Sequence, residues 1–174
     1  FPTEPGDARQ RYTLEVTLTD ESGLPVSSRG SIEVNPDEFY IGLRPDNWVT
    51  RSAGQAGFDI QVVDWLSQPD GARSLRAEFQ QVKWNRVDPQ TSNPEALPEY
   101  VAEYTPVSST DFTSSPEGKA RLAFSPPDPG TYMLDVYNTQ APAGQGARTQ
   151  ILLWVGGPGQ AVWPNLPNSR LRLV

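Results

Sequence analysis

Apolar and polar residues alternate with a period of two along most of this chain. In the stretch 131–137, one row holds Tyr132, Leu134 and Val136, and the other holds Thr131, Met133, Asp135 and Tyr137. Such alternation places one row toward a core and the other toward solvent or a sheet edge. The same pattern predicts seven strands after residue 38, near 39–43, 56–65, 74–84, 100–105, 119–124, 131–137 and 147–155. No stretch shows the period of an amphipathic helix, so we expect an all-β chain.

Turn signals between these strands indicate how they pack. The sequence Pro-Pro-Asp-Pro-Gly at 126–130 is a rigid turn, because proline fixes φ and glycine allows positive φ. Tyr132 comes directly after this turn, an arrangement that resembles the tyrosine corner of immunoglobulin-like domains. Seven short strands over roughly 115 residues fit an antiparallel two-sheet sandwich of the immunoglobulin or fibronectin type III kind.

The pattern of the last hairpin occurs twice in the chain. Tyr12-Thr-Leu-Glu-Val16 repeats Tyr132-Met-Leu-Asp-Val136 at an offset of 120 residues, and each copy leads through a polar turn into an apolar strand. A repeat of about domain length predicts tandem sandwiches. We therefore expect three parts: a terminal hairpin of a preceding domain at 1–36, a complete sandwich at 37–158, and a linker with the first strand of a following domain at 159–174.

The first hairpin, predicted at 11–19 and 30–35, carries an apolar face made of Tyr12, Leu14, Val16 and Leu18. A hairpin alone is marginal in water, and an uncovered apolar face favours association. We expect it to pack against the complete sandwich, to pair with the segment Arg170–Val174, or to dock onto a second copy of the chain.

Composition excludes several classes of function. A net charge of −7 argues against a nucleic-acid partner, because phosphate binding needs clustered Lys and Arg. No apolar run approaches the roughly 18 residues of a membrane span, so direct membrane insertion is not expected. The chain has no cysteine and no histidine, which removes disulfides, thiolate chemistry and the commonest general base.

Three glutamates could form a catalytic carboxylate pair. Glu95, Glu99 and Glu103 are spaced four residues apart, and two carboxylates suffice for glycoside hydrolysis. Even spacing puts residues of one strand on one face, but Glu95 falls in a proline-rich loop where that register does not hold. The expected role of these side chains is therefore a solvated surface.

Serine is the remaining candidate nucleophile. Ser108, Ser109 and Ser114 have no histidine partner, so a Ser-His-Asp triad is excluded. A serine–lysine pair with Lys83 or Lys119 is the arrangement left open. We expect no enzyme activity, no catalytic residue and no cofactor.

Acidic turns could in principle hold a hard cation. Asp20, Glu21 and Ser22 cluster in one turn, and Asp111 could combine with Glu117. Neither group has the spacing of an EF-hand loop, and polar turn residues explain both. We therefore predict no metal site.

Two further features have a functional and a structural interpretation. The tryptophans could line a carbohydrate-binding platform or seal the sandwich against a neighbouring domain; they are Trp48, Trp65, Trp84, Trp154 and Trp163. Open, coplanar rings at Trp48 and Trp84 would indicate the platform. The segment Asn85–Pro98, with three prolines and no apolar period, is either a protease-sensitive bait or a surface loop.

Several phrases together resemble the bacterial α2-macroglobulins, in the macroglobulin-like domains upstream of the thioester region. They are Tyr12-Thr-Leu-Glu-Val-Thr-Leu-Thr-Asp20-Glu-Ser-Gly23, Phe39-Tyr-Ile-Gly-Leu-Arg-Pro45, Val63-Asp-Trp65, Gly118-Lys-Ala120, Gly130-Thr-Tyr132 and Leu153-Trp-Val-Gly-Gly157. The phrases occur in the family's order and span nearly the whole chain. The resemblance implies a macroglobulin-like sandwich that serves as a scaffold module in a periplasmic, or otherwise extracytoplasmic, broad-spectrum protease trap.

The resemblance also implies partners: neighbouring domains of the parent protein and, through that protein, target proteases. The family's thioester needs a Cys-x-Glu-Gln motif, and this chain has no cysteine, so any reactive centre and the bait segment are expected elsewhere. The alternative interpretation is an extracellular carbohydrate-binding or adhesin-type sandwich, in which exposed tryptophans would act.

Overall fold

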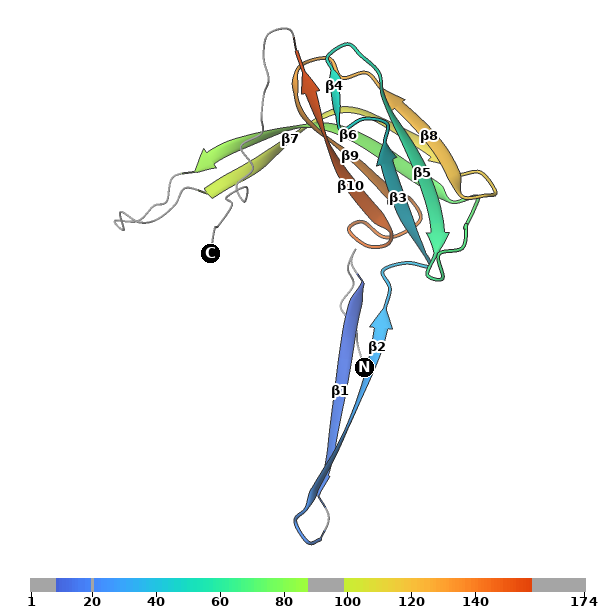
Figure 1. The fold of residues 1–174 in the computed structure, drawn as a ribbon, viewed down its shortest axis with the longest axis vertical. Coiled ribbons are helices and arrows are strands. Elements are labelled where there is room, and N and C mark those ends of the chain that lie inside the picture. Colours follow the sequence, from blue (N-terminus) through green and yellow to red (C-terminus); the bar gives the residue numbers. More distant parts are fainter. Residues whose placement is uncertain (1–8, 20, 88–98, 158–174) are drawn as a thin grey trace, which may run out of the picture.

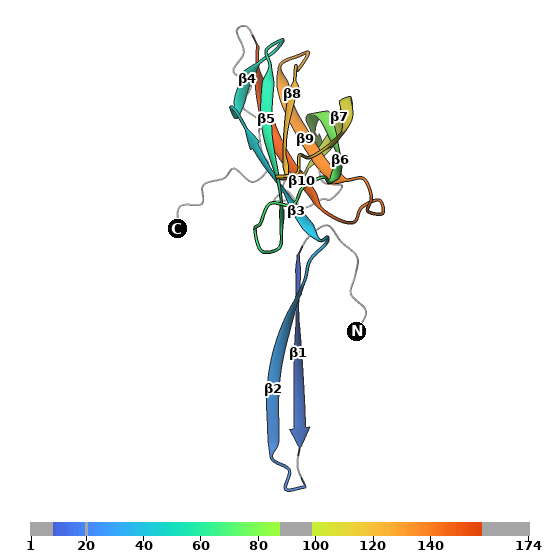
Figure 2. The same ribbon diagram turned by 90° about the vertical axis from the view of Figure 1, so that its right-hand side faces the viewer.

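The computed structural model describes residues 9–19, 21–87 and 99–157, which form ten strands and no helix. A separate hairpin pairs β1 (Gln10–Thr19) with β2 (Pro25–Val34). It projects from one end of a β-sandwich whose strands lie between Phe39 and Gly156 (Figures 1 and 2). No helix long and apolar enough to cross a membrane occurs in the described ranges.

Two sheets face each other in the sandwich. The larger sheet has the strand order β4-β10-β9-β6-β7, and these strands are β4 (Val49–Arg51), β6 (Ser74–Val87), β7 (Glu99–Thr113), β9 (Gly130–Asn138) and β10 (Arg148–Gly156). The smaller sheet has the order β3-β5-β8, with β3 (Phe39–Pro45), β5 (Ala56–Asp64) and β8 (Lys119–Phe124). Neighbours are antiparallel except for the short parallel pair of β4 and β10.

The core is built from the alternating apolar rows of both sheets. Phe58 of β5 and Leu134 of β9 are fully buried, and the rings of Phe79 and Phe124 stack between the sheets with centroids 3.7 Å apart. The core cluster contains residues from 39 to 155 and none from the hairpin. The predicted sandwich core is therefore confirmed, and its period-two pattern is the physical reason these strands form.

The predicted tyrosine corner is also confirmed. Tyr132 is fully buried, and its hydroxyl donates a hydrogen bond to the backbone oxygen of Asp128, 2.8 Å away, within the proline-rich turn. The Asp128 amide lies 3.3 Å from the same hydroxyl oxygen and donates to it. Burial raises the pKa of Tyr132, because the neutral phenol is favoured over a buried phenolate.

Several boundaries differ from the sequence-based expectation, and β2 begins at Pro25 rather than near residue 30. The sandwich has eight strands rather than seven, because Val49–Arg51 pairs with the end of β10. β7 was expected to end near residue 105, but it continues to Thr113 along β6. β6 extends to Val87, so Asn85 belongs to a strand and not to the predicted loop, whose remaining residues 88–98 lie outside the described ranges.

A bulge interrupts the pairing of β6 with β7. Phe79 faces Ser108 and Gln80 faces Pro106, so Val107 is an extra residue on β7. The pairing of β6 with β9 runs without interruption, from Leu75 opposite Asn138 to Val82 opposite Thr131. The irregularity therefore affects only β7, at the edge of the sheet.

Candidate functional site: the outer sheet faces and the exposed hairpin

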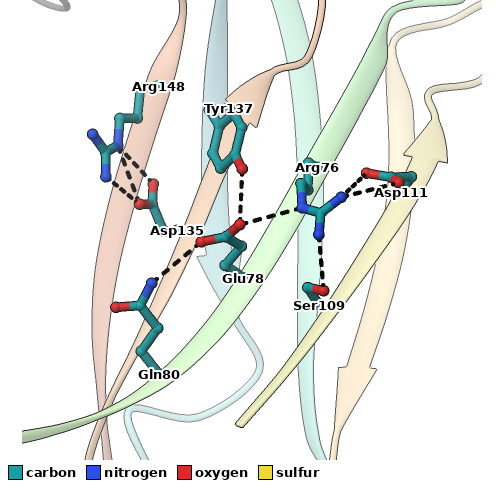
Figure 3. A network of polar contacts seen from close by, with 8 residues as sticks. All are labelled: Arg76, Glu78, Gln80, Ser109, Asp111, Asp135, Tyr137 and Arg148. Carbon is teal, nitrogen blue, oxygen red and sulfur yellow. Dashed lines mark hydrogen bonds and ion pairs between the residues drawn. The ribbon is translucent and has the colours of Figure 1, made fainter. Parts of the chain in front are cut away.

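The outer face of the five-stranded sheet carries a polar network (Figure 3). Cross-strand pairing brings Gln150, Asp135, Glu78 and Ser109 into one row, and Arg148, Tyr137, Arg76 and Asp111 into the next. The first row holds the carboxylates of Asp135 and Glu78, and the second row holds two arginines, so charges of opposite sign lie side by side.

Asp135 lies at one side of the network, beside Arg148 (Figure 3), and is 1% exposed. Arg148 donates to it from Nε at 3.0 Å and from Nη2, and Gln150 Nε2 donates at 3.1 Å. A carboxylate removed from water requires such partners, because an unpaired buried charge is strongly unfavourable. The role of Arg148 and Gln150 is therefore to supply the hydrogen bonds and the charge that allow Asp135 to be buried.

Glu78 is the second acceptor of the network. Tyr137 donates to its carboxylate at 2.8 Å and Arg76 Nε at 3.2 Å, and Arg76 also contacts Asp111 at 3.2 Å. Burial, followed by the nearby Glu78 carboxylate, raises the pKa of Tyr137, and Asp111 raises the pKa of Arg76. Both groups therefore keep their protons at neutral pH, so neither is suited to act as a general base.

A hollow of about 620 Å³ lies beside this network. Its lining combines Arg76, Glu78 and Tyr137 with the connection between β9 and β10, including Pro142 and Gly144. The charged groups on its wall are already paired with one another, as Figure 3 shows for Arg76 and Arg148. The arrangement suits a rigid surface better than a site that must exchange ligands.

The other half of the same outer face is apolar. Val82 and Met133 lie on it and are 4% and 7% exposed, although neither belongs to the core between the sheets. Trp154 lies in the same cross-strand row as Thr131 and Val82, and Trp84 is two residues further along β6. The indole nitrogens of Trp84 and Trp154 are buried and have no hydrogen-bond acceptor in the described structure.

The tryptophans do not form the open platform that carbohydrate stacking would need. Trp48 and Trp65 are 57% and 68% exposed, whereas Trp84 is only partly exposed. Trp48 immediately precedes β4, and two strands, β10 and β9, separate that strand from β6, which carries Trp84. With strands about 4.8 Å apart, the two residues lie too far apart to hold one sugar ring. Trp163 lies outside the described residues.

The candidate catalytic residues are not brought together. Glu103 accepts a hydrogen bond from Asn85 at 2.9 Å, as a surface residue of β7, while Glu95 and the side chain of Glu99 lie outside what the structure describes. Ser109 accepts from Arg76, and Ser114 accepts from the backbone nitrogen of Arg73. Within the described residues, the Ser108 side chain has no hydrogen-bond partner, and Lys83 faces Glu103 across the strand pair.

The candidate cation ligands have other roles. Asp111 pairs with Arg76, and Glu117 accepts a hydrogen bond from Ser115 at 2.8 Å. Glu21 and Ser22 lie in the tip of the first hairpin, and Asp20 is outside the described residues. Across the described ranges, no group of three or more Asp, Glu, His or Cys side chains could hold a metal ion.

A charge cluster also covers the outer face of the three-stranded sheet. Arg121 contacts Asp46 and Asp59, and Arg44 contacts Asp59 at 2.7 Å. The Arg44 and Arg121 guanidinium groups lower the pKa of Asp59, and the two aspartates raise the pKa of Arg121. Gly57 permits this approach, because a Cβ there would lie 2.1 Å from the Asp46 carboxylate. No local sequence pattern predicts this cluster, since its members are far apart along the chain.

The β1–β2 hairpin has one polar and one apolar face. Arg11 pairs with Glu33 and Arg29 with Glu15 on the polar face. The apolar face is largely open to solvent, with exposures of 54% for Leu14, 57% for Val16, 71% for Leu18, 69% for Val26 and 60% for Ile32. No close packing joins either hairpin strand to a strand of the sandwich. Of the three arrangements expected for the hairpin, the structure does not show packing against the complete sandwich, and Arg170–Val174 lies outside the described residues.

Comparison with known proteins shows likeness at the level of structure. No family model matches the sequence, and no curated protein matches it. The chain is similar to *Salmonella* α2-macroglobulin reacted with methylamine, with a TM-score of 0.59 and 13% identity over 86% of this chain and 10% of that one. It is similar to *Escherichia coli* α2-macroglobulin in its native conformation, with a TM-score of 0.60 and 14% identity over 85% of this chain and 10% of that one.

A further similar structure is *Escherichia coli* α2-macroglobulin activated by porcine elastase, with a TM-score of 0.59 and 16% identity over 85% of this chain and 13% of that one. The chain therefore spans only 10–13% of the length of these three α2-macroglobulin structures. At these identities the likeness shows the fold alone. The described residues have the macroglobulin-like β-sandwich fold found in bacterial α2-macroglobulins.

Proposed function

We propose that this chain is a structural scaffold module of a bacterial α2-macroglobulin-like protease inhibitor, a protease trap, and that its residues hold no reactive centre. The observation that carries the proposal is the likeness to three bacterial α2-macroglobulin structures at TM-scores of 0.59 to 0.60. The closed charge networks support it, because paired side chains on a sheet face stabilise a surface but leave no group free to react. In this proposal the module acts mechanically and without catalysis.

The hairpin supports a tandem arrangement, with 1–36 as the end of one sandwich, 37–158 as the next, and 159–174 leading into a third. Leu14 and Val16 occupy positions equivalent to Leu134 and Val136 in the repeat. The later pair is fully buried in the core, whereas the earlier pair is more than half exposed. The same apolar pattern is thus buried in a core in the second copy of the repeat and open to solvent in the first copy. The missing partner that fits it is a sheet of the same kind, and a second copy of this chain could replace it.

The proposed partners are the neighbouring domains of the parent protein and, through that protein, target proteases. The proposed location is the periplasm or another extracytoplasmic space, and only the structural likeness supports it. A carbohydrate-binding or adhesin-type module is not favoured, because Trp48 and Trp84 are separated by two strands.

The proposal is tested with a protease, using the isolated chain and the longer protein that carries it. The chain alone should neither inhibit the protease nor form a covalent adduct, because it has no cysteine and no histidine-supported nucleophile. Denaturing gels should show cleavage products only. The longer protein should block cleavage of a protein substrate, since a closed shell excludes large molecules. A small peptide should still be cleaved, because it can enter the shell.

Two results would contradict this function. A protease-sized covalent shift of the isolated chain would place a reactive centre within these residues. A longer protein that leaves cleavage of the protein substrate unchanged would mean that the module does not serve a trap.

A further inference from the structure

The connection between the hairpin and the sandwich is short and is bonded at several points. β2 ends at Val34 and β3 begins at Phe39, so four residues, Asn35 to Glu38, join the two parts. Figures 1 and 2 show the hairpin continuing away from the end of the sandwich in both views. Because the hairpin strands do not pack on the sandwich strands, these few residues must determine the direction in which the hairpin points.

The carboxylate of Asp37 is the centre of this connection. Its Oδ2 accepts hydrogen bonds from Asn138 Nδ2 at 2.7 Å and from the backbone nitrogen of Ala147 at 2.8 Å. Its Oδ1 accepts from the backbone nitrogen of Glu38 at 2.8 Å. Hydrogen bonds to an ionised acceptor are about twice as strong as neutral ones, so this carboxylate joins three parts of the chain firmly.

The partners of Asp37 are themselves fixed. The backbone nitrogen of Asn138 donates to the oxygen of Ala147 at 2.9 Å, which closes the connection between β9 and β10. Gly146 has a φ of +81° and lies against Asp37, where a Cβ would come within 2.9 Å of Oδ2. A glycine at this position thus allows both the turn and the close approach of the carboxylate.

Two weaker anchors flank the central one. The Tyr40 hydroxyl donates to Asn35 on the hairpin side. On the sandwich side, Arg73 lies 3.5 Å from Glu38 and 2.7 Å from Asp70, and its guanidinium sits 4.8 Å from the centre of the Phe39 ring. Burial of these contacts is only partial, so solvent weakens them.

Packing does not take the place of these bonds. A hollow of about 710 Å³ opens beside the connection, lined by Glu33 and Val34 of the hairpin and by Asp64 and Trp65 of the sandwich. Trp65 is 68% exposed and does not fill this space. A hairpin released from Asp37 would therefore have room to swing.

We propose that Asp37 is a latch that holds the hairpin at one fixed angle to the sandwich, so that the two parts form a rigid joint and not a flexible hinge. The proposal goes beyond the scaffold function and does not depend on it, because it concerns this chain alone. In a tandem array, such a joint would transmit a rotation of one module to the next.

The absence of cysteine permits a direct measurement of the angle. Thr19→Cys near the hairpin tip and Lys119→Cys on β8 provide two exposed sites for spin labels. The distance distribution between the labels should be a single narrow peak. Asp37→Ala should abolish that narrow peak. Asp37→Asn should broaden it less, because the amide oxygen can still accept from Asn138 and Ala147, although it is uncharged and its NH2 group faces the Glu38 amide. Asp128→Ala, at an exposed carboxylate without a hydrogen-bond partner in the described structure, should leave the peak unchanged.

Hydrogen exchange distinguishes a released joint from an unfolded protein. In Asp37→Ala the Ala147 amide should exchange about tenfold faster or more, because it loses a charged acceptor, while the Tyr132 amide keeps its protection. A broad distribution of label distances in the parent chain would overturn the proposal. So would a peak that stays narrow in Asp37→Ala.

Discussion

The Tyr132 hydroxyl shows how much a single buried polar atom can contribute. It exchanges hydrogen bonds with the backbone of Asp128, and the residue is fully buried. Tyr132→Phe removes the hydroxyl but keeps the ring, so the free energy of unfolding should fall by about 1–2 kcal/mol, measured by denaturant titration. Tyr104→Phe, at a residue 49% exposed, is the matched control and should have no effect. Equal effects of the two changes would mean that the corner adds nothing.

Asp135 provides a second prediction at this scale. Arg148→Met keeps much of the side chain's length but leaves the buried carboxylate with Gln150 alone. The free energy of unfolding should fall by about 3 kcal/mol, because a buried charge loses its partner. Arg44→Met, which removes an arginine that is 81% exposed, should leave stability nearly unchanged. A loss at Arg148 no larger than that at Arg44 would show that Asp135 does not need its ion pair.

The sequence predicts one of these two residues and not the other. Tyr132 follows a Pro-Gly turn, and that local signal suffices to predict the corner. Asp135 looks like any polar residue of an alternating strand, and Arg148 lies 13 residues away across a long turn. Their pairing depends on the register of β9 and β10, which no local pattern determines.

At the scale of elements, the sandwich should fold without the hairpin. All core residues lie between 39 and 155, and the hairpin adds none. Deleting residues 1–36 should therefore leave a cooperative thermal transition, followed by circular dichroism. If the shortened chain is unfolded, the hairpin belongs to the main sandwich and the proposed boundary at Pro36 is wrong.

Strand prediction succeeded wherever one face of a strand is buried. Six of the seven predicted sandwich strands contribute buried side chains to the core, and the seventh, at 100–105, occurs as part of β7 although none of its side chains is buried. The part of β7 from Ser108 to Thr113 is polar and mostly exposed, so only its pairing with β6 makes it a strand. The three residues of β4 likewise depend on the edge of β10. Such edge strands carry little hydrophobic pattern of their own.

At the scale of the whole molecule, the exposed hairpin face should cause self-association. Val16→Glu places a charge on that face and should weaken association, because it opposes apolar contact. In sedimentation experiments, the average molecular mass of the variant should therefore rise less steeply with protein concentration than that of the parent chain. Thr13→Glu adds the same charge to the opposite face and should leave association as in the parent chain. A parent chain that stays monomeric at high concentration would contradict this expectation.

The overall fold could be inferred from the sequence, but the joint could not. Alternation and turns indicate a sandwich, and phrases such as Phe39 to Pro45 indicate its kind. Asp37 follows a proline in what looks like an ordinary polar turn, and its two sandwich partners lie 101 and 110 residues away. Contacts of that separation exist only once the sheets have formed.

The bulge at Val107 has a consequence for how the protein resists fibril formation. β7 is a long edge strand, and an uninterrupted edge is a template for cross-β growth. Pro106 cannot donate a backbone hydrogen bond, and the extra residue beside it shifts the register. An incoming strand can therefore match Glu99–Thr105 or Ser108–Thr113, but it cannot follow both in one register. We therefore expect the irregularity that bends the edge of the sheet to oppose the growth of a cross-β stack along β7.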